Sequence, residues 1–205
     1  MLNSEGFDSF IDEYDGLTST SDKNNTYPFA GYSKVLDKIY NAIVQTPNST
    51  VLDLGFGTGK LTRRLYDYGC TIYGQDFSKK MVELAKKSMP NGHFYQADFA
   101  NGLQEALTHQ KYDYIVATYA LHHLSDEQKT ELISKLLNNL KENGKILIGD
   151  ISFENRNLLN QCKEVAGNEW DDEETYCVAD KLKKVFPNLQ FTAESFCGGV
   201  FVIDK

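Results

Sequence analysis

The sequence predicts an α/β fold with a mainly parallel sheet, helices on both of its faces and an antiparallel hairpin at the end of the chain. Between residues 50 and 150, short apolar runs alternate with amphipathic helical stretches. This alternation is typical of strand–helix–strand units in a parallel sheet. The last two β-rich runs, residues 189–195 and 199–203, are joined by three residues. Such a short connection cannot make a parallel crossover. We therefore expect five parallel strands followed by an antiparallel hairpin strand.

The expected elements follow from apolar periodicity, glycines and capping residues. Ser78 and either Ser125 or Asp126 are expected helix N-caps, because their side-chain oxygens can accept from backbone amides of the first turn. The expected strands are residues 50–54, 71–75, 93–97, 112–118 and 145–150, the last after a turn at Asn143-Gly144. The expected helices are residues 60–68, 78–88, 126–140, 155–166 and 175–186.

The first part of the chain predicts a helical cap over this sheet. Phe7, Phe10 and Tyr14 recur at helical spacing, and a second apolar stripe predicts a helix over residues 31–44. The polar, turn-rich residues 16–28 between them are expected to form a surface loop that moves as a lid. We therefore expect a single domain over residues 1–205, with residues 1–45 as the cap.

Composition limits the classes of partner. The chain has 205 residues and a net charge of −8 without a basic cluster, which disfavours nucleic acid as a partner. No apolar run approaches the roughly 20 residues of a membrane helix, and the N-terminus lacks a signal-peptide pattern. We therefore expect a cytoplasmic protein without a membrane partner and with its four cysteines reduced. No acids and histidines show metal-ligand spacing, so the sequence predicts no metal.

The most informative segment is Val-Leu-Asp-Leu-Gly-Phe-Gly-Thr-Gly-Lys at residues 51–60, where a strand ends in a glycine-rich turn and a helix begins. In open α/β sheets, ligands bind at such carboxyl ends of strands. The phosphate-loop pattern GxxxxGK[ST] fails because Leu61 follows Lys60. The dinucleotide pattern GxGxxG fails because Gly59 comes one residue early. The pattern present is DxGxGxG, beginning at Asp53.

This DxGxGxG segment resembles the first motif of class I methyltransferases, in which the loop wraps the amino-acid part of S-adenosylmethionine. Tyr-Pro-Phe-Ala-Gly-Tyr at residues 27–32 and Ala-Thr-Tyr-Ala-Leu-His-His-Leu at residues 117–124 further resemble the YrrT-type small bacterial methyltransferases. The resemblance covers nearly the whole chain and is weakest over residues 155–174. It implies a Rossmann-like fold, S-adenosylmethionine as cofactor and S-adenosylhomocysteine as product. It implies little about the methyl acceptor.

Two further acids stand at strand ends. Asp76 ends the second expected strand, where a carboxylate can accept hydrogen bonds from both ribose hydroxyls. The resemblance implies that Asp98 meets the adenine amino group while Phe99 packs on the ring. Either acid alone could instead be a helix N-cap or lie in a solvated turn. The full set of cofactor-binding residues that the resemblance implies is Asp53, Gly55, Phe56, Gly57, Thr58, Gly59, Asp76, Phe77, Met81, Asp98, Phe99 and Thr118.

Two histidines follow the fourth expected strand at the mouth of the expected pocket. Histidine suits general-base catalysis because its pKa lies near neutrality. Adjacent residues cannot both face the acceptor, so we favour His122 as the catalytic base and His123 as a structural hydrogen bonder beside the substrate. The alternative is that both are structural.

Aromatic side chains are expected to border the transferred methyl group, because aromatic faces stabilise a cationic sulfonium. Tyr14, Tyr32 and Tyr119 are the candidates, with Tyr176 a weaker fourth, and plain packing is the alternative for each. Trp170 is expected in a packed cap, and the acidic residues 171–174 are expected to be solvated at the start of a helix.

Together these features predict an S-adenosylmethionine-dependent methyltransferase acting on a small-molecule acceptor. One alternative is methylation of a macromolecule, either protein or RNA, which the acidic balance and the lack of an appended binding domain disfavour. Another is a non-catalytic module that binds S-adenosylmethionine or S-adenosylhomocysteine. A Rossmann oxidoreductase is disfavoured by the glycine spacing. The sequence determines neither the acceptor atom nor the oligomeric state.

Overall fold

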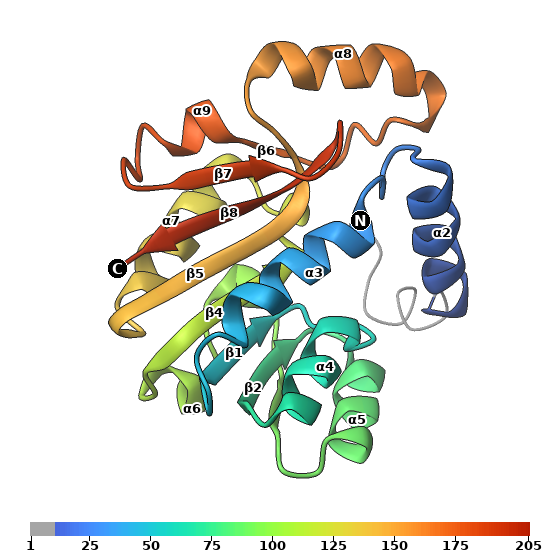
Figure 1. The fold of residues 1–205 in the computed structure, drawn as a ribbon. Helices are drawn as coiled ribbons and strands as arrows, with labels where there is room; N and C mark the ends of the chain where they lie inside the picture. The colour runs from blue at the N-terminus through green and yellow to red at the C-terminus, as the bar shows by residue number, and fades with distance from the viewer. Residues whose placement is uncertain (1–10) are drawn as a thin grey trace.

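The computed structural model describes the backbone from Ile11 and the side chains from Gly16 onward. An eight-stranded sheet forms its centre, with the order β3-β2-β1-β4-β5-β8-β7 and with β6 paired to β5 off this path (Figure 1). The strands are β1 (Thr50–Leu54), β2 (Thr71–Asp76), β3 (His93–Gln96), β4 (Tyr112–Thr118), β5 (Leu140–Phe153), β6 (Cys177–Val178), β7 (Gln190–Ala193) and β8 (Gly198–Asp204).

The strand directions confirm the predicted architecture. Strands β1 to β5 are parallel, while β8 runs antiparallel to both β5 and β7. The chain therefore closes with the antiparallel hairpin that the short connection after residue 195 required. The carboxyl ends of β1, β2 and β4 meet at one edge of the sheet because these strands are parallel neighbours.

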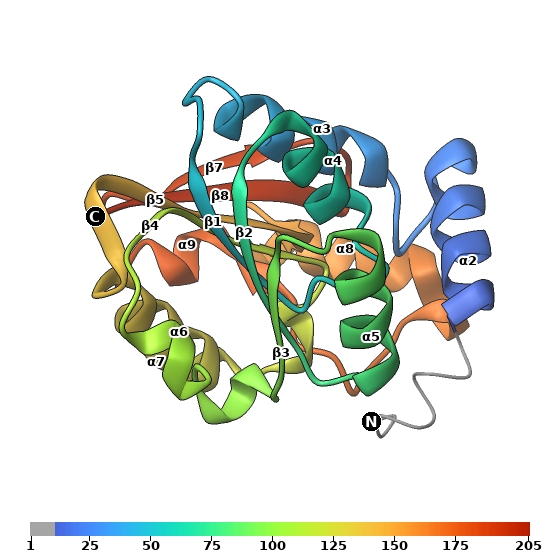
Figure 2. The same cartoon turned by 90° about the horizontal axis from the view of Figure 1, so that it is seen from below.

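Helices cover both faces of the sheet, as Figure 2 shows from below. The α-helices are α2 (Ile11–Asn24), α3 (Tyr32–Ile43), α4 (Lys60–Tyr68), α5 (Lys79–Ser88), α6 (Glu105–Thr108), α7 (Asp126–Leu137), α8 (Arg156–Ala166) and α9 (Ala179–Leu182). Helices α3, α4 and α5 share one hydrophobic cluster with Val51 of β1, whereas α7 and α9 share the other with Leu52 and Leu54. Alternate side chains of β1 thus enter opposite cores, as expected of a parallel strand buried on both faces.

The sheet and its first covering helix approach each other closely at Gly149. A Cβ atom there would lie 2.5 Å from Cγ1 of Val35 and 2.8 Å from Cδ1 of Ile39, both on α3. Real side chains do not tolerate such distances, so glycine on β5 lets α3 lie directly against the sheet.

The prediction of a loop over residues 16–28 is wrong, because α2 continues to Asn24. Thr18 and Ser21 are buried on this helix. The Lys60 ammonium donates to Thr18 Oγ1 at 3.2 Å, and Ser21 Oγ accepts from the Phe29 amide at 2.9 Å. Partners elsewhere in the fold therefore satisfy polar side chains that favour a loop in isolation. The expected contacts of Phe7, Phe10 and the Tyr14 side chain lie outside the described residues.

Several other boundaries differ from the prediction. Helix α7 ends at Leu137 instead of residue 140, and β5 begins at Leu140. The expected turn at Asn143 lies inside β5, at a φ of 64° next to a register shift against β4. The helix expected over residues 175–186 is instead strand β6 followed by the short α9, because Cys177 pairs with Ser152 of β5.

Among the described residues, no helix has the length and apolar character needed to span a membrane.

Candidate active site

The glycine-rich turn between β1 and α4 adopts a backbone that requires glycine. Gly55, Gly57 and Gly59 have φ values of 68°, 53° and 78°, in the left-handed region that L side chains rarely adopt. A Cβ on Gly55 would lie 2.7 Å from Cβ of Ala120, so the loop lies against the segment that follows β4. A Cβ on Gly57 would meet no atom within 4 Å. The loop thus leaves open space beside Gly57, as a backbone that receives a ligand must.

Asp53 lies buried beneath this loop. Its Oδ2 accepts from the Thr62 hydroxyl at 2.6 Å, while its Oδ1 has no hydrogen-bond partner among the described residues. Burial raises the pKa of Asp53 to about 7, with a smaller contribution from the charge of Asp76. A buried oxygen without a partner costs about 1–3 kcal/mol. A buried polar atom of this kind is explained by strain, by a bound water or ion, or by a catalytic role.

The two other predicted acids take different positions. Asp76 is buried and ties the loop to the end of β2, because its Oδ2 accepts from the Gly57 amide and its Oδ1 from the Ser78 amide, each at 2.9 Å. A carboxylate oxygen can accept more than one hydrogen bond. Asp98 is exposed and caps the 3₁₀ helix η1 (Phe99–Asn101), accepting from the Ala100 amide at 2.8 Å. The contacts of Asp98 are therefore those of a helix N-cap, which the sequence analysis gave as the alternative to a cofactor-binding role.

The remaining predicted cofactor residues divide into edge and core positions. Phe99 is buried with its ring against Gly55, and Thr58 is exposed on the glycine loop. Phe77 and Thr118 are half-buried at the carboxyl ends of β2 and β4. The other two side chains belong to the core. Phe56 packs edge-on against Phe94 with ring centroids 5.2 Å apart, and Met81 is buried on α5.

His122 forms a buried pair with Asp150 next to the glycine loop. Both histidines lie on η2 (Leu121–His123), directly after the segment that Gly55 contacts. His122 Nδ1 lies 2.6 Å from Asp150 Oδ1, and Asp150 Oδ2 accepts from the Leu121 and His122 amides. Burial disfavours the charged form of His122, but Asp150 and Glu174 outweigh it and raise its pKa. Asp150, which the sequence analysis did not single out, thus fixes the imidazole so that Nε2 faces Glu174.

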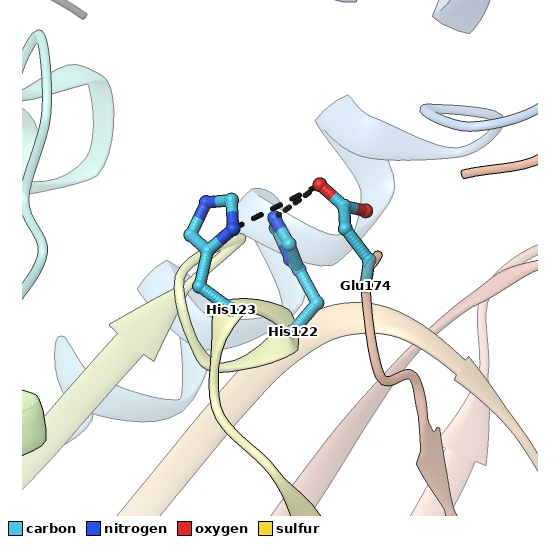
Figure 3. A group of neighbouring side chains, drawn as sticks. All are labelled: His122, His123 and Glu174. Atoms are coloured by element: carbon cyan, nitrogen blue, oxygen red, sulfur yellow. Dashed lines mark ion pairs between the residues drawn. The ribbon is translucent and has the colours of Figure 1, made fainter. Parts of the chain in front are cut away.

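Glu174 completes a cluster with the two histidines. Its Oε1 lies 3.5 Å from His122 Nε2 and 3.8 Å from His123 Nδ1. Figure 3 shows the two imidazoles and the carboxylate pointing toward one another. Burial and the neighbouring His122 lower the pKa of His123 to about 4, while burial raises that of Glu174.

One sequence-based prediction is therefore corrected, because Glu174 is half-buried at the histidines instead of solvated at a helix start. The fold also gathers His122, His123 and Glu174 into a group that could hold a metal ion. The absence of a metal stays a prediction. The spacing along the chain could not reveal this group, because Glu174 follows the histidines by about fifty residues. No signal at residue 174 distinguishes it from its acidic neighbours.

The segment that carries Glu174, just before β6, is anchored to the histidine turn. The Thr175 amide donates to the His122 carbonyl at 2.9 Å. The ammonium of Lys129, a fully buried residue of α7, donates to the carbonyls of Thr175 and Leu124, each at 2.5 Å. These bonds hold Glu174 in place without using its carboxylate.

Aromatic rings join the N-terminal cap to this region. Tyr27 stacks on Trp170 with centroids 5.3 Å apart, and its hydroxyl hydrogen bonds to that of Tyr176. Of the predicted substrate tyrosines, Tyr32 and Tyr119 lie together with centroids 4.7 Å apart. Tyr27 and Tyr32 therefore contact residues that lie on either side of the histidine turn in the sequence.

Comparison with known proteins identifies the family. A sequence profile described as a methyltransferase domain matches residues 45–191. The chain belongs to this family. An uncharacterized methyltransferase of Anoxybacillus flavithermus is 37% identical over 150 residues, covering 73% of this chain and 68% of that protein. Another, from Geobacillus sp. WCH70, is 34% identical over 194 residues, covering 91% of this chain and 88% of the relative.

The fold agrees with the family. Magnesium protoporphyrin IX methyltransferase of Synechocystis, crystallised with S-adenosylhomocysteine, matches with a TM-score of 0.67 at 19% identity, covering 86% of this chain and 84% of that one. The predicted class I methyltransferase fold is thereby confirmed. The narrower YrrT-type resemblance stays a prediction.

Proposed function

We propose that this methyltransferase transfers the methyl group of S-adenosylmethionine to a small-molecule acceptor and releases S-adenosylhomocysteine. The observation that carries the proposal is the glycine loop, whose left-handed backbone is open beside Gly57 at the carboxyl edge of the sheet. The S-adenosylhomocysteine bound to the structurally similar Synechocystis enzyme supports the choice of cofactor.

The residues around the loop fit the polar groups of this cofactor. The partnerless Oδ1 of Asp53 suits the ammonium of the amino-acid part, because a buried carboxylate gains most from a charged donor. We assign Asp76 to the ribose hydroxyls and Phe99 to the adenine ring. Asp98 would reach the adenine amino group from its exposed position after β3.

Methyl transfer from a sulfonium is an in-line displacement by the acceptor's lone pair. The new bond forms to the methyl carbon while the carbon–sulfur bond breaks and its electron pair returns to sulfur. The protein must mainly align the reactants and exclude water. We place the acceptor at His122, whose Nδ1 bond to Asp150 leaves Nε2 to accept the acceptor's proton.

The packing of the N-terminal region near the carboxyl edge of the sheet favours a small acceptor. The contact between Tyr27 and Trp170 joins the N-terminal region to the segment that leads to Glu174, and the Thr175 amide bonds that segment to the histidine turn. A macromolecular substrate would need this contact to open widely, and the net charge of −8 opposes approach of a polyanion.

Calorimetric titration with S-adenosylmethionine and S-adenosylhomocysteine tests the cofactor, with NADH as a competing ligand. The wild-type protein should bind both at micromolar concentration, and Asp76→Ala should lose binding. Formation of S-adenosylhomocysteine with a panel of small thiols, amines and acids then tests the acceptor class. Failure of the wild-type protein to bind S-adenosylmethionine at millimolar concentration would refute the proposal. Binding without turnover of any small acceptor would favour the non-catalytic or macromolecular alternative.

A further inference from the structure

We propose that His122 Nε2, His123 Nδ1 and Glu174 bind a zinc-type divalent cation whose open coordination position takes the nucleophile of a thiol acceptor. The inference rests on the proposed function only in that methyl transfer is taken as the reaction that occurs at this cluster. It assigns His122 the role of a metal ligand in place of a general base.

The donor set is one that zinc uses in enzymes. Two histidines and one glutamate leave a fourth position for water or substrate in catalytic zinc sites. The three ligand atoms here all lie within 4.8 Å of one another. Zinc ligands at about 2.0–2.2 Å in a tetrahedron are roughly 3.3–3.6 Å apart. The two nitrogen–oxygen distances of 3.5 and 3.8 Å therefore need little movement.

Outer contacts hold two of the ligands in the orientation that a metal requires. Metal-binding histidines usually donate their second ring N–H to a carboxylate, which fixes the tautomer. Asp150 does this for His122 at 2.6 Å and leaves Nε2 facing the cluster. Glu174 is placed beside the cluster by the Thr175 amide, which donates to the His122 carbonyl at 2.9 Å.

The charges around the cluster also favour a cation. Three carboxylates act on His122 or its neighbour, namely Asp150, Glu174 and Asp171. The nearby positive charge is Lys129, whose ammonium donates to two backbone carbonyls. The local net charge is therefore negative. This favours a divalent cation, for which Glu174 would be the anionic ligand and Asp150 the carboxylate behind His122.

Such a site would change how the acceptor loses its proton. Soft thiolates are preferred zinc ligands, and a coordinating thiol is deprotonated at neutral pH. The thiol proton leaves to solvent when sulfur binds the metal. A sulfur lone pair then forms the bond to the methyl carbon, the sulfonium carbon–sulfur bond breaks, and its electrons return to the cofactor sulfur. The neutral thioether product binds zinc more weakly and can leave.

Metal titration of untagged, chelator-treated protein tests the proposal directly. Wild-type protein should bind one zinc ion, and His123→Gln and Glu174→Gln should each weaken this binding at least about 100-fold. The matched control is His109→Gln, which alters an exposed histidine on another part of the surface and should keep wild-type zinc affinity. Equal zinc binding by all variants, or no stoichiometric binding by wild-type protein, would overturn the metal site.

Cobalt as a spectroscopic substitute tests the acceptor class without turnover. Cobalt-loaded wild-type protein should gain a sulfur-to-metal charge-transfer band with 2-mercaptoethanol and none with ethanol, while absence of the band would refute a thiol ligand. Calorimetry with S-adenosylmethionine on the same samples separates the two proposals and reports folding. Zinc binding without cofactor binding would refute only the proposed function, and cofactor binding without zinc binding only the metal site.

Discussion

Asp53 should make the stability of this protein depend on pH in a direction opposite to that of an ordinary salt-bridged carboxylate. Its burial, and to a smaller extent the charge of Asp76, raise its pKa from 3.8 to about 7. Between these two values the folded protein holds a proton that the unfolded chain has released. Because the folded state then binds more protons, the free energy of unfolding falls as the pH rises through this range.

The size of the effect follows from the same shift. Each tenfold change in proton affinity corresponds to about 1.4 kcal/mol, so the loss of stability between about pH 4 and about pH 7 is at most about 4 kcal/mol. Asp53→Asn keeps an oxygen for the Thr62 hydroxyl but cannot ionise. The variant should therefore gain stability relative to wild-type protein as the pH rises.

Urea unfolding at several pH values measures this difference directly, because other titrating groups are common to both proteins. Asp180→Asn, which changes an exposed carboxylate, is the matched control and should follow the wild-type curve. A difference between Asp53→Asn and wild-type protein that stays constant with pH would mean that Asp53 is ionised in the folded protein. The assignment of a partnerless, protonated oxygen beneath the glycine loop would then be wrong.

Four other substitutions test the structure. Gly57→Ala should cost only about 1–2 kcal/mol of stability in urea unfolding, because a Cβ there meets no atom and suffers only left-handed strain. Gly55→Ala adds a clash with Ala120 and should cost about 1–3 kcal/mol more, so equal costs would contradict the loop geometry. Asp150→Asn breaks the buried pair with His122 and should lower the free energy of unfolding by about 3–5 kcal/mol. An unchanged melting curve would mean that the pair is absent. Ser21→Ala should cost about 1 kcal/mol and speed hydrogen exchange of the Phe29 amide, whereas unchanged exchange would exclude the bond.

The sequence by itself determined the sheet and the glycine loop. Strands β1 and β4 and helix α4 have the predicted bounds, because apolar runs between glycines and caps are local signals. The three left-handed glycines were likewise predictable from DxGxGxG, since only glycine adopts that backbone without strain. The parallel arrangement then brought Asp53, Asp76 and the histidines to one edge, as strand order alone required.

Only the tertiary structure decided the contacts between distant segments. Helix α2 contradicts its polar sequence because Lys60 and Phe29 provide partners for Thr18 and Ser21. Glu174 reaches the histidines because β6 adds to β5 and Thr175 hydrogen bonds to the histidine turn. Local patterns encode which residues can form a strand or a helix. They do not encode which polar side chain will be buried against which partner, because that depends on atoms brought together only when the sheet is complete.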